Sequence, residues 1–290
     1  MSVLSNKIGK SYVMTSALIS AAVVLLISIT LLINSWDAIT NVGWKLLSFN
    51  WNPSNQEFGI LPMIYGTVAV TLIALIVTLP LGIFTAIFTS EILPNKYRLS
   101  IKSILELLAG IPSIIYGLIG IAFFSIWVQD IFDLQSGRTI LTAGVLLGIM
   151  ILPTVITLTD DALQNVPPSY REASKGLGLY KYEVIKNSIL PIAKSDIIGA
   201  VLLAFGRALG ETMAVMLVIG SIDKIPDSIF NWLNPGQTIT SKLGREIAES
   251  SYGSTHFSTM IFMGLILFVF VLLLTFFAQK KFSHSNRLYE

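Results

Sequence analysis

The chain has 290 residues, of which 53% are hydrophobic and only 12% charged, and its mean hydropathy is +0.75. Soluble domains carry about twice that charged fraction, so the composition excludes an ordinary soluble protein and indicates one that is integral to a membrane. A net charge of +2 is too small for a nucleic-acid-binding surface, and the absence of cysteine excludes disulfides and thiolate metal sites.

Six apolar stretches are long enough to cross a bilayer, which predicts a single helical bundle. They span residues 12–34, 64–90, 104–128, 139–159, 197–220 and 257–279. The first follows Lys7 and Lys10, as in a signal peptide. Its apolar run exceeds 20 residues and lacks a small-residue cleavage site, so we expect an uncleaved anchor.

The basic residues give the orientation of these six crossings. If the N-terminus is cytoplasmic, 13 of the 19 Lys and Arg residues fall in inner segments, 5 in outer segments and one in the membrane. Inner loops of membrane proteins carry such an excess of Lys and Arg. We therefore expect both termini in the cytoplasm, and losing or adding a crossing would spoil the asymmetry.

Prolines and small residues interrupt several crossings. Pro80, Pro112 and Pro153 should each bend a helix, and such bends serve either simple packing or the lining of a cavity. The pairs Gly144-xxx-Gly148 and Gly206-xxx-Gly210 allow close contact between helices.

Two outer segments offer surfaces to a soluble partner. Residues 35–60 are rich in Trp, Asn and Pro and predict an extended loop with Trp36, Trp44 and Trp51 as interface anchors. Residues 221–256 include a polar run near 241–249 that predicts a helix.

Arg207 and Glu211 lie inside the fifth apolar stretch. An ionised side chain near the bilayer centre costs several kcal/mol, so such residues are expected to have a function. Their i,i+4 spacing predicts one helix face on which each partly neutralises the other. The pair is either a contact on a transport path, which we favour, or a buried ion pair that fixes helix register.

The longest inner segment, residues 159–191, predicts two short helices. Ser169 and Glu172 fit a capping box that starts the first helix, and Gly176 and Gly178 end it. A second helix is expected to continue to about residue 187 and to end at Pro191.

This segment resembles the EAA loop of bacterial ABC importer permeases. Glu172-Ala173-Ser174, then Gly178 and Leu190-Pro191, match its spacing. Two positions depart from the pattern, because Ser174 replaces the second alanine and Ser188 stands where isoleucine is usual. The resemblance implies a coupling helix that docks into a cleft of an ATPase subunit, a role it assigns to Glu172, Ala173, Ser174, Gly178, Leu190 and Pro191.

Longer motifs narrow the resemblance. Residues 58–67, 107–117, 148–154 and 206–214 are similar to the phosphate-specific (Pst) permeases, and the first and last of these are most similar to the PstC-type subunit. The implied fold is an all-α membrane protein, a six-helix type I importer bundle with a cytoplasmic coupling helix. The expected divisions are 1–57 (first crossing and periplasmic loop), 58–280 (permease domain, with its coupling loop at 160–195) and 281–290 (cytoplasmic tail).

The resemblance also implies partners and a location. They are a second permease of PstA type, a pair of PstB-type ATPases and a periplasmic PstS-type phosphate-binding protein, all at the bacterial inner membrane. ATP and Mg²⁺ would be bound by the ATPase, because Gly9-Lys10-Ser11 lacks the first glycine and the surroundings of a nucleotide-binding loop. We expect no cofactor on this chain, no nucleic-acid partner, and contact with lipid.

Phosphate in a low-dielectric path needs positive charge and hydrogen-bond donors, for which Arg207, Glu211 and Thr212 are the candidates. Two alternatives remain, namely an importer of sulfate or molybdate and a secondary transporter that uses the Arg–Glu pair as a proton relay. An intramembrane enzyme lacks support, because the serines have no plausible base and His256 and His284 look solvated rather than metal-ligating.

Overall fold

The computed structural model describes the backbone of residues 2–286 and the side chains of residues 9–94 and 96–276. Six apolar helical segments in this part of the chain are long enough to span a membrane, as the sequence predicts. The helices are α1 (Ser2–Asp37), α2 (Leu61–Ile87), α3 (Asn95–Ala109), α4 (Ser113–Ile119), α5 (Ser125–Phe132), α6 (Ile140–Gln164), α7 (Pro168–Gly176), α8 (Lys181–Val184), α9 (Leu190–Gly210), α10 (Met213–Val218), α11 (Ile239–Glu246) and α12 (Thr255–Asn286).

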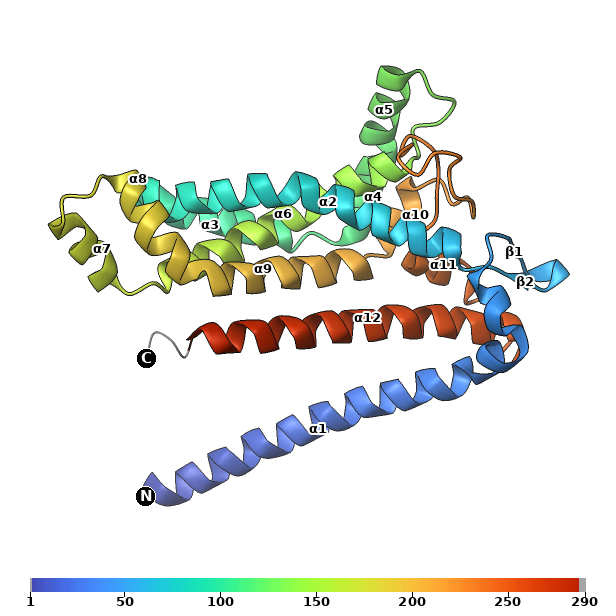
Figure 1. Ribbon diagram of the computed structural model, residues 1–290, viewed down its shortest axis with the longest axis horizontal. Helices are drawn as coiled ribbons and strands as arrows, with labels where there is room; N and C mark the ends of the chain where they lie inside the picture. Colours follow the sequence, from blue (N-terminus) through green and yellow to red (C-terminus); the bar gives the residue numbers. More distant parts are fainter. Residues whose placement is uncertain (1, 287–290) are drawn as a thin grey trace.

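The spans run side by side and have two distinct ends (Figure 1). The first and last described residues lie at the end that carries α7 and α8, which we name the inner end after the orientation predicted from the sequence. α11 lies toward the opposite end, named the outer end, with the strands β1 (Trp51–Asn52) and β2 (Glu57–Phe58). The segments expected to share a side of the membrane therefore do so. α1 is joined to α12 near this opposite end, where the Ser258 hydroxyl donates to the carbonyl of Asn34 and accepts from the Ala38 amide.

Packing of α6 on α2 forms the centre of the bundle. A Cβ atom on Gly144 would lie 2.5 Å from Cβ of Ile73, and one on Gly148 would lie 3.1 Å from the carbonyl oxygen of Ala74. The close contact predicted for this glycine pair is confirmed. Gly206 and Gly210 have no such neighbour within 4 Å, so the contact predicted for them is not made among the residues that the structure describes.

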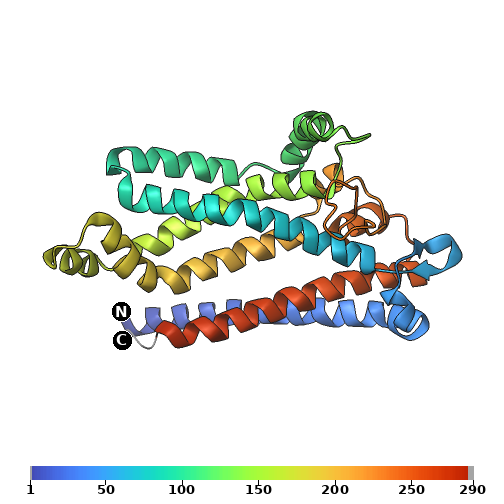
Figure 2. The same cartoon turned by 45° about the horizontal axis from the view of Figure 1, so that its top comes forward.

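The third crossing is not the single helix expected over 104–128. Amphipathic α3 starts at Asn95 and lies against α6, and the chain unwinds over residues 110–112 before α4 begins (Figure 2). Pro112 fixes the extended backbone that precedes α4. The Tyr116 hydroxyl donates to the Leu108 carbonyl at 3.0 Å, which satisfies an acceptor near the break.

The inner loop agrees with the prediction only in part. α7 ends at Gly176, and Gly178 has a left-handed φ of +79°, so the glycines end this helix as expected. No side chain caps α7, because Pro167 occupies its N-cap, and the capping box predicted at Ser169 is wrong. The second predicted helix of the loop does not end at Pro191. A wide turn over Ile185–Ile189 joins α8 to α9 instead, and it accommodates the missing N–H of Pro191.

The segment 35–60 is more ordered than a loop. Short helical turns over 38–47 and the two-stranded hairpin follow α1, and only Trp36 and Trp44 of the three tryptophans are exposed as interface anchors would be. Trp51 instead packs edge-to-face on Phe58. The helix predicted near 241–249 is present as α11, and much of its first turn is buried.

Candidate functional site

The fifth crossing breaks where one continuous helix was expected. α9 ends at Gly210, Glu211 is extended (φ −69°, ψ 127°), and α10 starts at Met213. The Glu211 carboxylate accepts a hydrogen bond from the Ala214 amide at 3.2 Å, and its carbonyl accepts one from the Thr240 hydroxyl at 2.7 Å. These contacts provide partners for groups that the break would leave unsatisfied.

Arg207 therefore does not pair with Glu211. Its guanidinium donates to the hydroxyl of Thr154 on α6 at 2.9 Å, and no ion pair joins it to Glu211 in the described structure. The expectation that the two charges neutralise each other on one helix face is wrong. The reason is the break, which turns Glu211 toward the start of α10.

The depth of Arg207 follows from its partner. Thr154 lies 14 residues from the outer end of α6 and 10 from its inner end, or roughly 21 and 15 Å along the helix. The guanidinium is exposed in the single chain, on a side of α9 where Leu203 is also exposed and Gly206 has no neighbour. Arg207 thus lies between the two ends of the bundle, on a face that the chain leaves open.

Thr212 lies in the break, next to Glu211. Its hydroxyl donates to the Gly210 carbonyl at 3.3 Å, and its methyl group faces Gly244 of α11, where a Cβ atom would lie only 2.8 Å away. The three residues predicted for a substrate path are thus close along the chain, but they point to different partners: Thr154, the start of α10, and α11.

The predicted coupling residues form a compact projection at the inner end of the bundle (Figure 1). Glu172, Ala173 and Gly178 are exposed, so they are free to contact another protein. Leu190 packs inward against the apolar cluster of the loop, and Pro191 is exposed beside it.

The two positions that depart from the EAA pattern contact each other. The hydroxyl groups of Ser174 and Ser188 are 2.7 Å apart and share a hydrogen bond, and Ser174 also donates to the Tyr170 carbonyl. A hydrogen-bonded pair of serines therefore joins α7 to the turn that leads into the fifth crossing. Both substitutions introduce a hydroxyl, which is the signal in the sequence that could have linked them.

Comparisons with known proteins agree with this geometry. Residues 78–284 match the family described as binding-protein-dependent transport system inner membrane component. A phosphate transport system permease protein PstC from Mesorhizobium japonicum is 38% identical over 87% of this chain and 82% of its own length. The chain belongs to this permease family and, within it, to the PstC type.

Further similarities place the permease among ABC importers. A probable ABC transporter permease protein, YqgH, from Bacillus subtilis is 36% identical over 81% of this chain and 77% of its own length. Two solved structures share the fold at low identity. A MetNI methionine ABC transporter has a TM-score of 0.57 at 17% identity, over 78% of this chain and 94% of the other. A bacterial alginate ABC transporter has a TM-score of 0.60 at 14% identity, over 97% and 98%.

A buried charged cluster at the outer end of the permease was missed from the sequence. The side chain of Lys242 is only 2% exposed and contacts the carboxylates of Asp223, at 2.5 Å, and Glu246. The Trp51 ring lies 4.9 Å from the ammonium group, and its indole N–H donates to Glu246. Burial raises the pKa of Asp223, and the hydrogen bond from Lys242 opposes that rise.

His256 belongs to the same cluster. Its Nε2 is 3.3 Å from Glu246, and its ring stacks on Phe58, so the expectation of a solvated side chain is wrong for His256. His284 lies outside the described side chains. The signal for this cluster was weak, because its members come from distant segments; Trp51 and Glu246, for example, are 195 residues apart.

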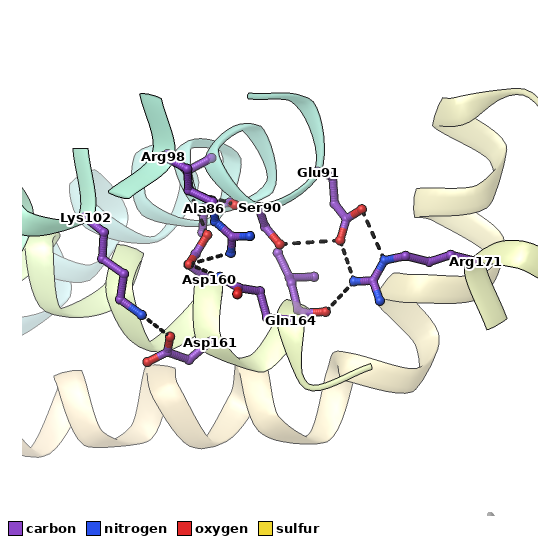
Figure 3. A network of polar contacts seen from close by, with 11 residues as sticks. Ala86, Ser90, Glu91, Arg98, Lys102, Asp160, Asp161, Gln164 and Arg171 are labelled. Carbon is purple, nitrogen blue, oxygen red and sulfur yellow. Dashed lines mark hydrogen bonds and ion pairs between the residues drawn. The ribbon is translucent and has the colours of Figure 1, made fainter. Parts of the chain in front are cut away.

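A second polar network lies at the inner end, where α2, α3, α6 and α7 meet (Figure 3). Ion pairs join Arg98 to Asp160 at 3.1 Å, Lys102 to Asp161 at 2.6 Å and Arg171 to Glu91 at 2.7 Å. The pair Asp160-Asp161, which directly follows the fourth apolar stretch, was the sequence signal for this network.

Proposed function

We propose that this chain is a permease subunit of an ATP-driven importer that moves inorganic phosphate across the bacterial inner membrane, with both termini in the cytoplasm. The relatives named as phosphate transport permeases support the cargo. The observation that carries the mechanism is Arg207, a cation near mid-membrane whose hydrogen bond goes to a neutral hydroxyl rather than to a carboxylate. Because its charge is not neutralised by an ion pair, it is available to an anion.

Arg207 binds phosphate through its planar fork of N–H groups, which matches the oxygens of a tetrahedral anion. Thr154 holds the guanidinium in place when the path is empty. Glu211 keeps the fifth crossing broken by capping α10, and Thr212 adds a hydroxyl beside the exposed backbone of the break. Unwound backbone at membrane depth is expected where it lines a cavity or is covered by protein.

The energy comes from a separate ATPase, which binds ATP and Mg²⁺. Glu172 and Ala173 on the exposed side of α7 enter its cleft, and Ser174, Gly178, Leu190 and Pro191 shape the loop behind them. A second permease of PstA type covers the open face of α9. A PstB-type ATPase pair and a PstS-type binding protein complete the complex.

Replacing Arg207 tests this function. Arg207→Gln keeps hydrogen-bonding capacity but removes the charge, and a charge-assisted bond contributes about 1.5–3 kcal/mol, so phosphate uptake should fall by roughly tenfold to a hundredfold. Uptake of radiolabelled phosphate is measured beside the amount of assembled complex. Arg138→Gln, which removes an exposed guanidinium at the outer end of α6, is the control and should transport normally.

Normal phosphate uptake by an assembled Arg207→Gln complex would contradict the proposed path. If the complex took up sulfate or molybdate in place of phosphate, the proposed cargo would be wrong. Phosphate uptake that does not require ATP would indicate a secondary transporter.

A further inference from the structure

Arg171 connects the coupling helix to two membrane-spanning helices. It lies on α7, one residue before Glu172, and its Nη2 is 2.7 Å from Oε1 of Glu91 (Figure 3). The same guanidinium donates to the carbonyls of Leu163, at 2.7 Å, and Val166, at 2.5 Å. Both side chains of the ion pair are largely buried, with 22% of Arg171 and 10% of Glu91 exposed.

Each of these contacts reaches a different element. Glu91 lies in the wide turn Phe88–Ile92 that continues α2, Leu163 lies in the last turn of α6, and Val166 lies between α6 and α7. The last carbonyls of a helix have no partner within the helix, and a cation there is favoured by hydrogen bonding and by the helix dipole. One guanidinium therefore holds α7, α2 and α6 together.

Neighbouring contacts also join the inner ends of α2 and α6. Asp160 on α6 is buried and accepts hydrogen bonds from Thr89 beside Glu91, from Arg98 on α3 and from Gln164. The Lys102–Asp161 pair is different, because it is more exposed and joins α3 to α6 without touching α7.

α6 links this inner end to the proposed anion path. The helix is continuous from Gln164 back to Ile140, and Thr154, which holds Arg207, lies ten residues from Gln164. A shift of the inner end of α6 therefore moves the hydroxyl group that positions Arg207.

We propose that the Arg171–Glu91 pair is the link through which movement of the coupling helix reaches α2 and α6, so that both are positioning residues for transport. This inference rests on the proposed function. Without the Arg171–Glu91 pair, α7 remains attached to the fifth crossing through Ser174 and Ser188. It loses the attachment that Arg171 makes to α2 and α6. ATP hydrolysis should then continue while less of its movement reaches the path.

The test measures phosphate transported per ATP hydrolysed. The complete transporter, with its ATPase, second permease and binding protein, is reconstituted into vesicles, and uptake and hydrolysis are followed in the same sample. Glu91→Gln and Arg171→Gln remove one charge each, and Arg171→Lys keeps the charge but loses the fork that reaches two carbonyls. Lys102→Gln is the matched control, since it breaks an inner ion pair that does not involve α7.

We expect Glu91→Gln and Arg171→Gln complexes to assemble and hydrolyse ATP while the transport ratio falls by at least about fivefold. Arg171→Lys should recover part of the ratio, and Lys102→Gln should match the wild type. A wild-type ratio in either assembled Gln variant would overturn the proposal, as would an equal fall in Lys102→Gln. Failure of both Gln variants to assemble would also overturn it, because the pair would then serve only folding.

The wild-type sample separates this inference from the proposed function. If it transports no phosphate, the proposed cargo fails, and the ratio is then measured with the oxyanion that is transported. If it transports phosphate and the variants keep its ratio, only the role of Arg171 and Glu91 fails.

Discussion

Three basic side chains of the permease are held in three different ways. Arg207 has a neutral hydroxyl partner on α6, and Lys242 is enclosed by two carboxylates and an indole ring. Arg171 shares its hydrogen bonds between Glu91 and two backbone carbonyls at and just beyond the end of α6. Lys242 and Arg171 already have carboxylate partners within the chain, so we assign them to structure and positioning. Arg207 is the one of the three that forms no ion pair among the described residues, and because an uncompensated charge away from water is costly, we propose it as the contact for an anion.

Asp223 should give the outer charged cluster a measurable pH dependence. Burial raises its pKa in the folded state above the usual 3.8, so the folded chain takes up a proton at a higher pH than the unfolded chain does. The stability that this group contributes therefore increases as the pH falls from neutral through the raised pKa. We expect the Tm of the wild type, measured in detergent, to rise relative to that of Asp223→Asn when the pH is lowered from neutral to just above the usual pKa of 3.8.

The control for this prediction is Asp227→Asn, because the Asp227 side chain is fully exposed. Its difference from the wild type should be the same at both pH values. If the Tm difference between Asp223→Asn and the wild type were also the same at both pH values, burial would not shift the titration of Asp223.

At the scale of elements, helix breaks and glycine contacts shape the bundle. The third crossing unwinds at residues 110–112 and the fifth at Glu211, and α4 packs on α10 just beyond both breaks, with Gly117 facing Ala214. α6, by contrast, stays continuous through Pro153 and packs closely on α2. The permease thus combines one rigid central helix with two interrupted ones.

Gly144 tests the contact between α2 and α6. A methyl group there would meet Ile73 at 2.5 Å, so Gly144→Ala should destabilise the permease by about 1–3 kcal/mol through overpacking. Thermal unfolding in detergent measures the change. Gly199→Ala on α9 has open space around it and should be neutral or stabilising, by up to about 1 kcal/mol, from helix propensity. Equal stability of the two variants would contradict the close contact.

At the scale of the whole molecule, the six spans differ in how much of their surface the chain covers. In the most apolar window of each, 67% of the α6 span is buried but none of the α1 span. Spans left open in this way contact lipid or another subunit. The open side of α9, with Leu203, Gly206 and Gly210, suits a close helix partner because small residues let backbones approach.

Gly206→Leu should therefore weaken assembly with the second permease while the chain still inserts in the membrane. The new side chain has free space within the single chain but would hold a partner helix away. Co-purification of the second permease, normalised to the amount of this chain, measures the effect. Leu81→Ala, at an exposed position of α2, is the control. Normal co-purification of Gly206→Leu would show that the partner does not lie on this side of α9.

The sequence by itself determined that the chain has six spans, which segments share each end of the bundle, and where the loop with Glu172 and Ala173 lies. These depend on local composition and spacing, because a bilayer selects apolar runs of fixed length wherever they occur. Tertiary structure alone decided the break at Glu211, where Ala214 and Thr240 take the place of a helical partner, and the enclosure of Lys242. It also decided that Arg207 bonds to Thr154, 53 residues away, rather than to Glu211 four residues away. Helical spacing gives the residues that can meet within one helix, but which hydrogen bonds form depends on the neighbours that the folded chain brings to each polar group.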